Sequence, residues 1–214
     1  DLSRDEPEVA SNIGIQLEHM ALTTWSISVR RRLRDAISHL KPKNVIQTGA
    51  GIGHLSAWFF HYFEQEDGLS NFQMIEEGNR FAVILTRLKE RYSSVPASIV
   101  VGTPSLLSSE LKAWNISKIG EPPMLPNADA IIVDSIMTRL ADDVKSMLPL
   151  LNKNGVLFTV EPTPPVGDRE EDDPEVVGFN KWMELIQSTN ETHHLAFAPL
   201  FGGTIVAWIG KDQD

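Results

Sequence analysis

Three glycines on alternate positions, Gly49, Gly51 and Gly53, mark the segment of the sequence best suited to chemistry. An apolar run at residues 45–46, typical of a short buried strand, precedes them, and an apolar, helix-like segment follows. Glycines at such a turn let the bare backbone approach a ligand closely. His54 stands where a dinucleotide-binding motif carries its third glycine, and the absence of a following Gly-Lys-Ser/Thr excludes a P-loop. The pattern therefore indicates a ligand without a pyrophosphate.

Two acids, Glu76 and Glu77, follow a second apolar run at residues 72–75. They stand roughly 20 residues beyond the glycines, the spacing at which an acid binds ribose in nucleotide-binding folds. A carboxylate at the tip of this strand can accept hydrogen bonds from both ribose hydroxyls. The alternative is that one of the two acids opens the next helix, where negative charge is favoured. We therefore expect one of them to bind a ribose.

Strand-like and helix-like patterns alternate along the chain after two N-terminal helical segments. We expect helices at residues 8–20, 23–40, 54–65, 79–92, 105–113, 138–149 and 174–189. We expect strands at 44–48, 72–76, 98–101, 129–134, 154–160, 193–198 and 203–209. Alternation predicts parallel β-α-β units, and the short last connection predicts an antiparallel hairpin. The predicted fold is α/β: a Rossmann-like, doubly wound, seven-stranded, mostly parallel sheet with an antiparallel C-terminal hairpin strand and helices on both faces.

The 214 residues are expected to form one domain, with an N-terminal helical prelude at 1–42 and an α/β core at 43–214. The sequence has no cysteine, which excludes disulfides, thiolate catalysis and cysteine-ligated zinc. A net charge of −10 argues against broad binding to nucleic acid, whose partners are usually basic. Without an apolar membrane span or a signal peptide, a cytoplasmic protein with no membrane partner is expected.

A local exception to the acidic character is a basic cluster, the four arginines between Arg30 and Arg34. We interpret it as a solvated helix face rather than as a phosphate or RNA contact. Two long loops are also expected, a proline-rich one at 114–128 and another at 161–175. Because ligands bind at the carboxyl ends of parallel strands, the loop at 161–175 is expected to border the site.

In their order, these segments resemble class I S-adenosylmethionine-dependent methyltransferases, and most of all the catechol and caffeoyl-CoA O-methyltransferase family. The family's Glu-x-Gly-x-Gly-x-Gly segment, followed by Tyr-Ser and often Trp, is similar to residues 47–58. Its Ile-Glu at the end of the second strand matches Ile75-Glu76, which selects Glu76 over Glu77 as the ribose ligand. Further likenesses are Gly102-Thr103-Pro104, Val133-Asp134, Leu148-Pro149-Leu150-Leu151 and the hairpin segment Phe201-Gly202-Gly203-Thr204. The resemblance covers nearly the whole chain.

The resemblance implies that the glycine loop and the following strand ends bind S-adenosylmethionine. The implied cofactor-binding residues are Gln47, Gly49, Ala50, Gly51, Gly53, His54, Glu76, Glu77, Gly102, Thr103, Pro104 and Asp134. Two of them depart from the family pattern. Gln47 replaces an acid near the methionine end of the cofactor, and Thr103 replaces an aspartate beside the adenine, where a hydroxyl can still form a hydrogen bond.

The family's divalent-cation site is only partly kept. Asp134 matches its aspartate from strand four, but the Asp-Asn pair from strand five is here Glu161-Pro162, and proline offers no side-chain oxygen. Met137 stands at the position of the lysine that commonly takes the hydroxyl proton. We therefore expect weak or no Mg²⁺ dependence, with Asp134 and Glu161 as the candidate metal ligands.

Asp134 is the expected catalytic residue, either as a metal ligand or directly as a base. The alternative for Asp134 is a cap on the segment that follows its strand. For His54, a place beside the cofactor and an ordinary helix start are equally plausible. For Trp25, the family position favours the acceptor pocket, and packing is equally plausible. Trp182 has helical spacing with apolar neighbours and is expected in the core.

The expected function is O-methylation of a small hydroxylated acceptor with S-adenosylmethionine. A homodimer is expected, with contacts through the N-terminal helices and the loop at 114–128. Two alternatives remain open. One is a tRNA-modifying methyltransferase that uses the arginine cluster, and the other is a noncatalytic protein that binds S-adenosylmethionine or S-adenosylhomocysteine.

Overall fold

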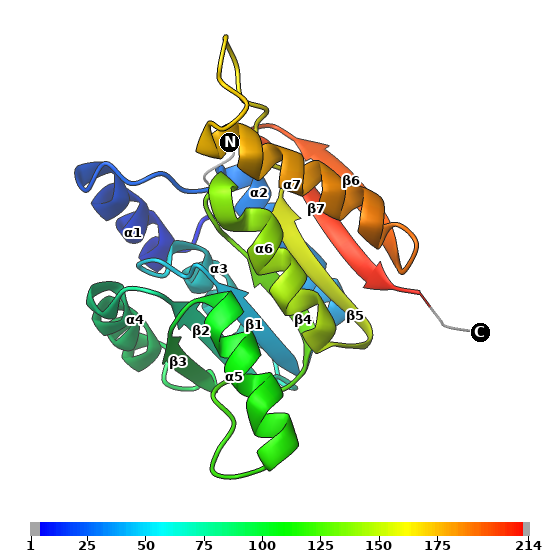
Figure 1. Ribbon diagram of the computed structural model, residues 1–214. Coiled ribbons are helices and arrows are strands. Elements are labelled where there is room, and N and C mark those ends of the chain that lie inside the picture. Colours follow the sequence, from blue (N-terminus) through cyan, green and yellow to red (C-terminus); the bar gives the residue numbers. More distant parts are fainter. Residues whose placement is uncertain (1–4, 212–214) are drawn as a thin grey trace.

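The seven strands form one sheet in the computed structural model, which describes residues 5–211 (Figure 1). The strands are β1 (Asn44–Thr48), β2 (Asn71–Glu76), β3 (Ala97–Val101), β4 (Ala128–Val133), β5 (Leu151–Val160), β6 (His193–Leu200) and β7 (Gly203–Gly210). Their order across the sheet is β3-β2-β1-β4-β5-β7-β6, and β7 runs antiparallel to both of its neighbours. The strand pairs β1–β2, β1–β4, β2–β3 and β4–β5 are parallel. The predicted mostly parallel sheet with an antiparallel C-terminal hairpin is confirmed.

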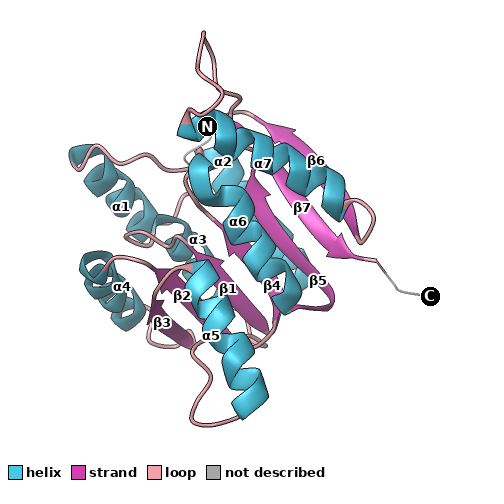
Figure 2. Ribbon diagram, in the orientation of Figure 1, coloured by secondary structure: helices cyan, strands magenta, loops and turns pink. Residues whose placement is uncertain are grey.

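Helices cover both faces of this sheet (Figure 2). They are α1 (Glu8–His19), α2 (Ile27–Leu40), α3 (His54–Phe63), α4 (Asn79–Arg91), α5 (Pro104–Ser117), α6 (Met137–Met147) and α7 (Pro174–Thr189), with a short 3-10 helix at Leu148–Leu150. Helices α1 to α4 contribute to one hydrophobic cluster, and α5 to α7 contribute to the other. Within residues 5–211, no helix combines the length and apolarity that crossing a membrane requires.

The central strands are apolar on both sides because both faces of the sheet are covered. In β1, Val45 packs into the cluster under α1 to α4, whereas Ile46 packs into the opposite cluster. In β4, Ile132 packs into the cluster under α1 to α4, and Ile131 packs into the opposite cluster. Trp182 of α7 is 1% exposed and belongs to the second cluster, which confirms its predicted place in the core.

Helix α2 begins at Ile27, four residues later than the predicted start at residue 23. The reason is a cap. The hydroxyl of Ser26 accepts a hydrogen bond from the backbone N–H of Val29 at 3.3 Å, and the backbone of Ser26 is extended. The α1–α2 connection, residues 20–26, is therefore longer than predicted.

The glycine loop joins β1 to α3 at the carboxyl edge of the sheet. Strand β1 lies between β2 and β4, so that Thr48 is opposite both Ile75 and Val133. The residues that follow these two partners are Glu76 and Asp134. The strand register therefore brings two carboxylates from distant parts of the chain to the two sides of the loop.

The three glycines of the loop differ in their surroundings. Gly49 has φ +66°, and a Cβ there would lie 1.9 Å from the carbonyl oxygen of Asp134. Gly53 has φ +89°, and its Cβ would lie 2.5 Å from the side chain of Leu88. Gly51 has φ +57°, but a Cβ there would meet nothing within 4 Å. Gly49 and Gly53 thus permit close packing, while Gly51 faces open space.

This difference predicts unequal effects of two otherwise matched substitutions. Gly51→Ala should lower the free energy of unfolding by about 1–2 kcal/mol, because the added methyl is strained only by the left-handed backbone. Gly49→Ala carries the same strain and also a backbone clash, so it should destabilise the fold much more or prevent expression. Urea denaturation of both variants measures the difference. Equal destabilisation would contradict the packing of Gly49 against Asp134.

Candidate functional site

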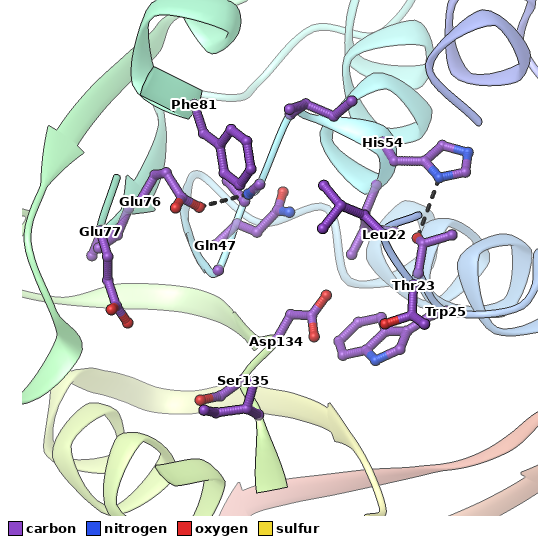
Figure 3. Close-up of a pocket in the computed structure, with 18 of the residues that line it drawn as sticks. Leu22, Thr23, Trp25, Gln47, His54, Glu76, Glu77, Phe81, Asp134 and Ser135 are labelled. Carbon is purple, nitrogen blue, oxygen red and sulfur yellow. Dashed lines mark hydrogen bonds between the residues drawn. The ribbon is translucent and has the colours of Figure 1, made fainter. Parts of the chain in front are cut away.

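A cavity of about 610 Å³ opens where the carboxyl ends of β1, β2 and β4 meet. Its volume is typical of sites for small ligands. The lining residues are Leu17, Leu22, Thr23, Thr24, Trp25, Arg30, Gln47, Gly49, Ala50, Gly51, Ile52, His54, Leu55, Ile75, Glu76, Glu77, Phe81, Gly102, Pro104, Asp134, Ser135, Ile136, Arg139 and Asp143. In Figure 3 the Asp134 carboxylate points toward the middle of the cavity, with Glu76 and Leu22 on opposite sides.

The Glu76 carboxylate is fixed against the glycine loop. Its Oε2 accepts a hydrogen bond from the backbone N–H of Gly51 at 2.7 Å, and its Oε1 accepts one from the N–H of Gly78 at 3.2 Å. The residue is 9% exposed and lies at the end of β2. Each carboxylate oxygen can accept more than one hydrogen bond. The side chain can therefore hold the loop and still accept hydrogen bonds from a ligand in the cavity.

Glu77 lines the same cavity but extends toward helix α6. Its Oε2 accepts a hydrogen bond from Arg139 Nη1 at 2.8 Å, and its Oε1 lies 2.6 Å from Arg139 Nη2. Both side chains are about two-fifths exposed, at 40% and 41%. This bidentate ion pair connects the end of β2 to the first turn of α6.

Asp134 follows the last residue of β4 and is partly buried. Desolvation, followed by repulsion from the Glu76 carboxylate, raises the pKa of Asp134 to about 7. A carboxyl group with such a pKa exchanges a proton near neutral pH, which is the property of an efficient general base. Its position and its pKa therefore suit proton transfer within the cavity.

Gln47 supplies a buried polar contact at the back of the cavity. It is 1% exposed, and its Oε1 accepts a hydrogen bond from the hydroxyl of Ser56 at 2.9 Å. Its amide nitrogen has two N–H groups that can donate to a ligand.

The wall opposite Glu76 comes from the N-terminal part of the chain. Leu17 of α1 and the connection residues Leu22, Thr24 and Trp25 line the cavity there. Arg30 of α2 anchors this connection, because its guanidinium donates a hydrogen bond to the carbonyl oxygen of Trp25. The loop that sequence reasoning assigned to helix α2 is therefore a wall of the cavity.

Arg30 corrects the prediction that the arginine cluster is a solvated face. Its side chain is only 8% exposed, and its Nη2 donates to Glu6 Oε1 at 3.2 Å. Arg31 and Arg34 instead pair with Asp5 at the surface. The prediction is wrong for Arg30 because Glu6 and the Trp25 carbonyl provide the partners that a buried cation requires.

His54 lies at the junction of this wall with α3. It is 6% exposed, its Nδ1 is 3.2 Å from Thr24 Oγ1, and its Nε2 is 3.8 Å from Glu6 Oε1. Desolvation and then the charge of Arg30 lower the pKa of His54 to about 4. The imidazole is therefore neutral near pH 7. It joins the N-terminal wall to the start of α3.

Three predicted site residues do not line the cavity. Gly53 packs against α4, and the Thr103 hydroxyl accepts a hydrogen bond from Leu106 N–H as the N-cap of α5. Glu161 is exposed, so of the two predicted metal ligands only Asp134 faces the cavity. The prediction that the loop at 161–175 borders the site is wrong, since none of its residues lines this cavity.

Sequence reasoning also missed several lining residues. They are Leu17, Leu22, Thr23, Thr24, Arg30, Ile52, Leu55, Ile75, Phe81, Ser135, Ile136, Arg139 and Asp143. One usable signal was present, since Ser26 is a residue type that caps helices and would have placed Thr23 and Thr24 outside α2. Arg139 and Asp143 gave no local signal, because a surface helix normally carries such charges.

The chain is similar in fold to several solved structures that are described as methyltransferases. The O-methyltransferase TomG of Streptomyces achromogenes, involved in tomaymycin synthesis and solved with S-adenosylmethionine (SAM), has 14% identity and a TM-score of 0.71, covering 97% of this chain and 92% of its own. An O-methyltransferase of Bacillus cereus, solved with S-adenosylhomocysteine (SAH), has 17% identity and a TM-score of 0.66, covering 96% and 93%. The Podospora anserina methyltransferase PaMTH1, solved with SAH, has 14% identity and a TM-score of 0.71, covering 99% and 92%.

No protein-family model and no curated protein sequence matches the chain. At such low identity, the structural likeness establishes the fold. The chain has the class I methyltransferase fold, with seven strands in the order 3-2-1-4-5-7-6.

The raised pKa of Asp134 predicts how its substitution changes stability with pH. Because the folded-state pKa of about 7 exceeds the ordinary value of 3.8, the stability that this group contributes is present at low pH and is lost as pH rises through 7. Asp134→Asn removes this dependence. At pH 8 the variant should be more stable than the unchanged protein by roughly 1–4 kcal/mol, and near pH 4 the two should be similar. Urea denaturation at both pH values measures this, and a difference that is independent of pH would contradict the assignment.

Proposed function

We propose that this protein is a SAM-dependent methyltransferase that acts on a hydroxyl group of a small acceptor. The observation that carries the proposal is the buried Glu76 carboxylate, which is fixed to Gly51 N–H at the edge of an open cavity. A carboxylate in this position is suited to the two ribose hydroxyls of a nucleoside. The three structural neighbours described above support SAM as that nucleoside.

The cavity has the shape and polarity that this cofactor requires. The space in front of Gly51, where a Cβ would meet nothing within 4 Å, leaves room for a ligand against the backbone. On this proposal Glu76 binds the ribose, Gly102 and Pro104 lie beside the adenine, and the Gln47 amide serves the methionine end. The adjoining wall consists of Gly49, Ala50, Gly51 and His54. Gly53 and Thr103 do not line the cavity and support this wall indirectly.

The chemistry needs little from the protein beyond orientation and one proton transfer. When bound, SAM supplies an electrophilic methyl group on a sulfonium. Asp134 accepts the proton of the acceptor hydroxyl, a role for which a pKa of about 7 is suited. Leu17, Leu22 and Trp25 provide an apolar wall for the acceptor, which favours a flat, hydrophobic molecule such as a phenol.

A working divalent-cation site does not fit the residues present. Within residues 5–211 there is no group of three or more His, Cys, Asp or Glu side chains that could hold a metal ion. Glu161 is exposed and outside the cavity lining, and Pro162 has no side-chain oxygen. Asp134 is therefore proposed as the base rather than as a metal ligand.

The structure argues against one of the two alternative functions, and an activity assay tests the other. Burial of Arg30 and the pairing of Arg31 and Arg34 with Asp5 weaken the case for tRNA binding through the arginine cluster. A noncatalytic SAM-binding protein would keep Glu76 but would not need a carboxyl group like that of Asp134. Turnover with a panel of phenols separates this alternative from the enzyme.

We further propose a twofold homodimer in the cytoplasm. Twofold dimers are the commonest oligomers, and the end of α5 and the segment that follows it expose large apolar side chains. Ile116 and Ile119 are 89% and 81% exposed, and both lie within residues 114–128, the segment that we expected to form contacts. The N-terminal helices remain the second expected contact.

Calorimetry with SAH tests the cofactor assignment. The unchanged protein should bind it, and Glu76→Ala should weaken binding by roughly 1–3 kcal/mol, the cost of leaving buried hydrogen-bonding groups unpaired. Gly51→Val should abolish binding, because its side chain fills the space in front of the loop. Glu90→Ala, on the exposed side of α4, is the matched control and should bind normally. Failure of the unchanged protein to bind SAH would refute the proposed function.

Chelation tests the assignment of Asp134 as a base without a metal. With any phenol that proves active, methyl transfer should keep most of its rate in excess EDTA, because the cavity supplies too few oxygen ligands for a tight Mg²⁺ site. Asp134→Asn should remove most of the activity under both conditions. Complete loss of activity in EDTA, restored by added Mg²⁺, would show that a working metal site exists.

A further inference from the structure

The Glu77–Arg139 ion pair connects two walls of the cavity that are 62 residues apart in sequence. Glu77 directly follows the proposed ribose ligand Glu76, and Arg139 lies in the first turn of α6, beyond β4. Figure 3 shows the Glu77 side chain extending from the end of β2 along the side of the cavity on which Ser135 lies. Both residues of the pair line the cavity. Their two short contacts therefore join the β2 side of the cavity to the β4 side.

This ion pair lies at the rim of the cavity and not in its interior. Both side chains are about 40% exposed, whereas the neighbouring Glu76 is 9% exposed. Gly102 and Pro104, proposed to lie beside the adenine, line the same cavity. Because Glu77 directly follows Glu76, the pair lies next to the proposed ribose ligand, at the nucleoside end of the proposed cofactor site.

Breaking this ion pair should also disturb the fold little. Exposed ion pairs contribute little to stability and are weakened by salt. A second acid, Asp143 on the same helix, adds to the negative potential at Arg139. The buried Arg139 Nε has no hydrogen-bond partner. The guanidinium therefore keeps an unused donor and has a second carboxylate near it when the contact to Glu77 breaks.

We propose that Glu77 and Arg139 form a clasp across the nucleoside end of the cavity, which must open whenever the cofactor enters or its product leaves. The proposal rests on the proposed function, because it takes SAM and SAH as the molecules that exchange. The clasp controls the rate of exchange. Since product release limits the turnover of many enzymes, these two residues would then set an upper limit on the methyl-transfer rate.

Rapid-mixing kinetics with SAH test the clasp, and calorimetry of the unchanged protein first establishes that SAH binds. SAH has no net charge at neutral pH, so long-range attraction changes its association rate little. Glu77→Gln and Arg139→Gln each break the ion pair. Asp142→Asn is the matched control, because it breaks the exposed Asp142–Lys181 pair on the same helix outside the cavity lining.

In both clasp variants, the association and dissociation rate constants should rise together, by roughly threefold or more for the loss of one ion pair. The equilibrium constant should change less than either rate. The double variant Glu77→Gln/Arg139→Gln should resemble the single variants, since the pair acts as one unit. Added salt should accelerate exchange in the unchanged protein but not in the variants, and Asp142→Asn should exchange like the unchanged protein.

Three results would overturn the clasp while leaving the proposed function intact. The first is unchanged rates in Glu77→Gln. The second is faster dissociation with unchanged association, which would make Glu77 a direct ligand contact. The third is an equal effect of Asp142→Asn. If SAH does not bind the unchanged protein at all, the proposed function fails, and the clasp fails with it.

Discussion

The hydrogen bond from Gly51 N–H to the Glu76 carboxylate is the contact on which the geometry of the site depends. It joins the loop after β1 to the end of β2, and the parallel register of the two strands brings its partners together. A buried carboxylate is costly unless backbone or side-chain donors compensate it. The N–H groups of Gly51 and Gly78 provide this compensation, and the loop takes its shape from the contact.

The same register explains the chemistry of Asp134. Strand β1 lies between β2 and β4, so the carboxyl group that follows β4 is placed in the field of Glu76. This repulsion adds to desolvation, and together they raise the pKa of Asp134 to about 7. The carboxylate that anchors the loop thus also prepares its neighbour to exchange a proton. In the proposed function, Glu76 would therefore link cofactor binding to proton transfer by Asp134, without a contribution from Met137.

Local sequence patterns were sufficient to predict the sheet and the part of the cavity that is formed by the glycine loop and the end of β2. Strand β1, its glycine turn and the acid pair Glu76-Glu77 are close in sequence or separated by one helix, so periodicity and spacing identify them, and the family resemblance selects Glu76. The N-terminal wall was not predictable in this way. Arg30 is buried only because Glu6 and the Trp25 carbonyl meet it in the folded chain, and no local pattern distinguishes it from a surface arginine. The Glu77–Arg139 pair likewise depends on a contact between distant segments.

The measurement that tests the central claim most directly compares SAH with its analogue that lacks both ribose hydroxyls. Calorimetry of the two ligands, with the unchanged protein and with Glu76→Gln, forms a cycle that isolates the contact between the carboxylate and the ribose. Loss of the hydroxyls should weaken binding to the unchanged protein by roughly 1–3 kcal/mol and should cost the variant much less. An equal loss in both proteins would show that Glu76 holds the loop but does not bind the ribose.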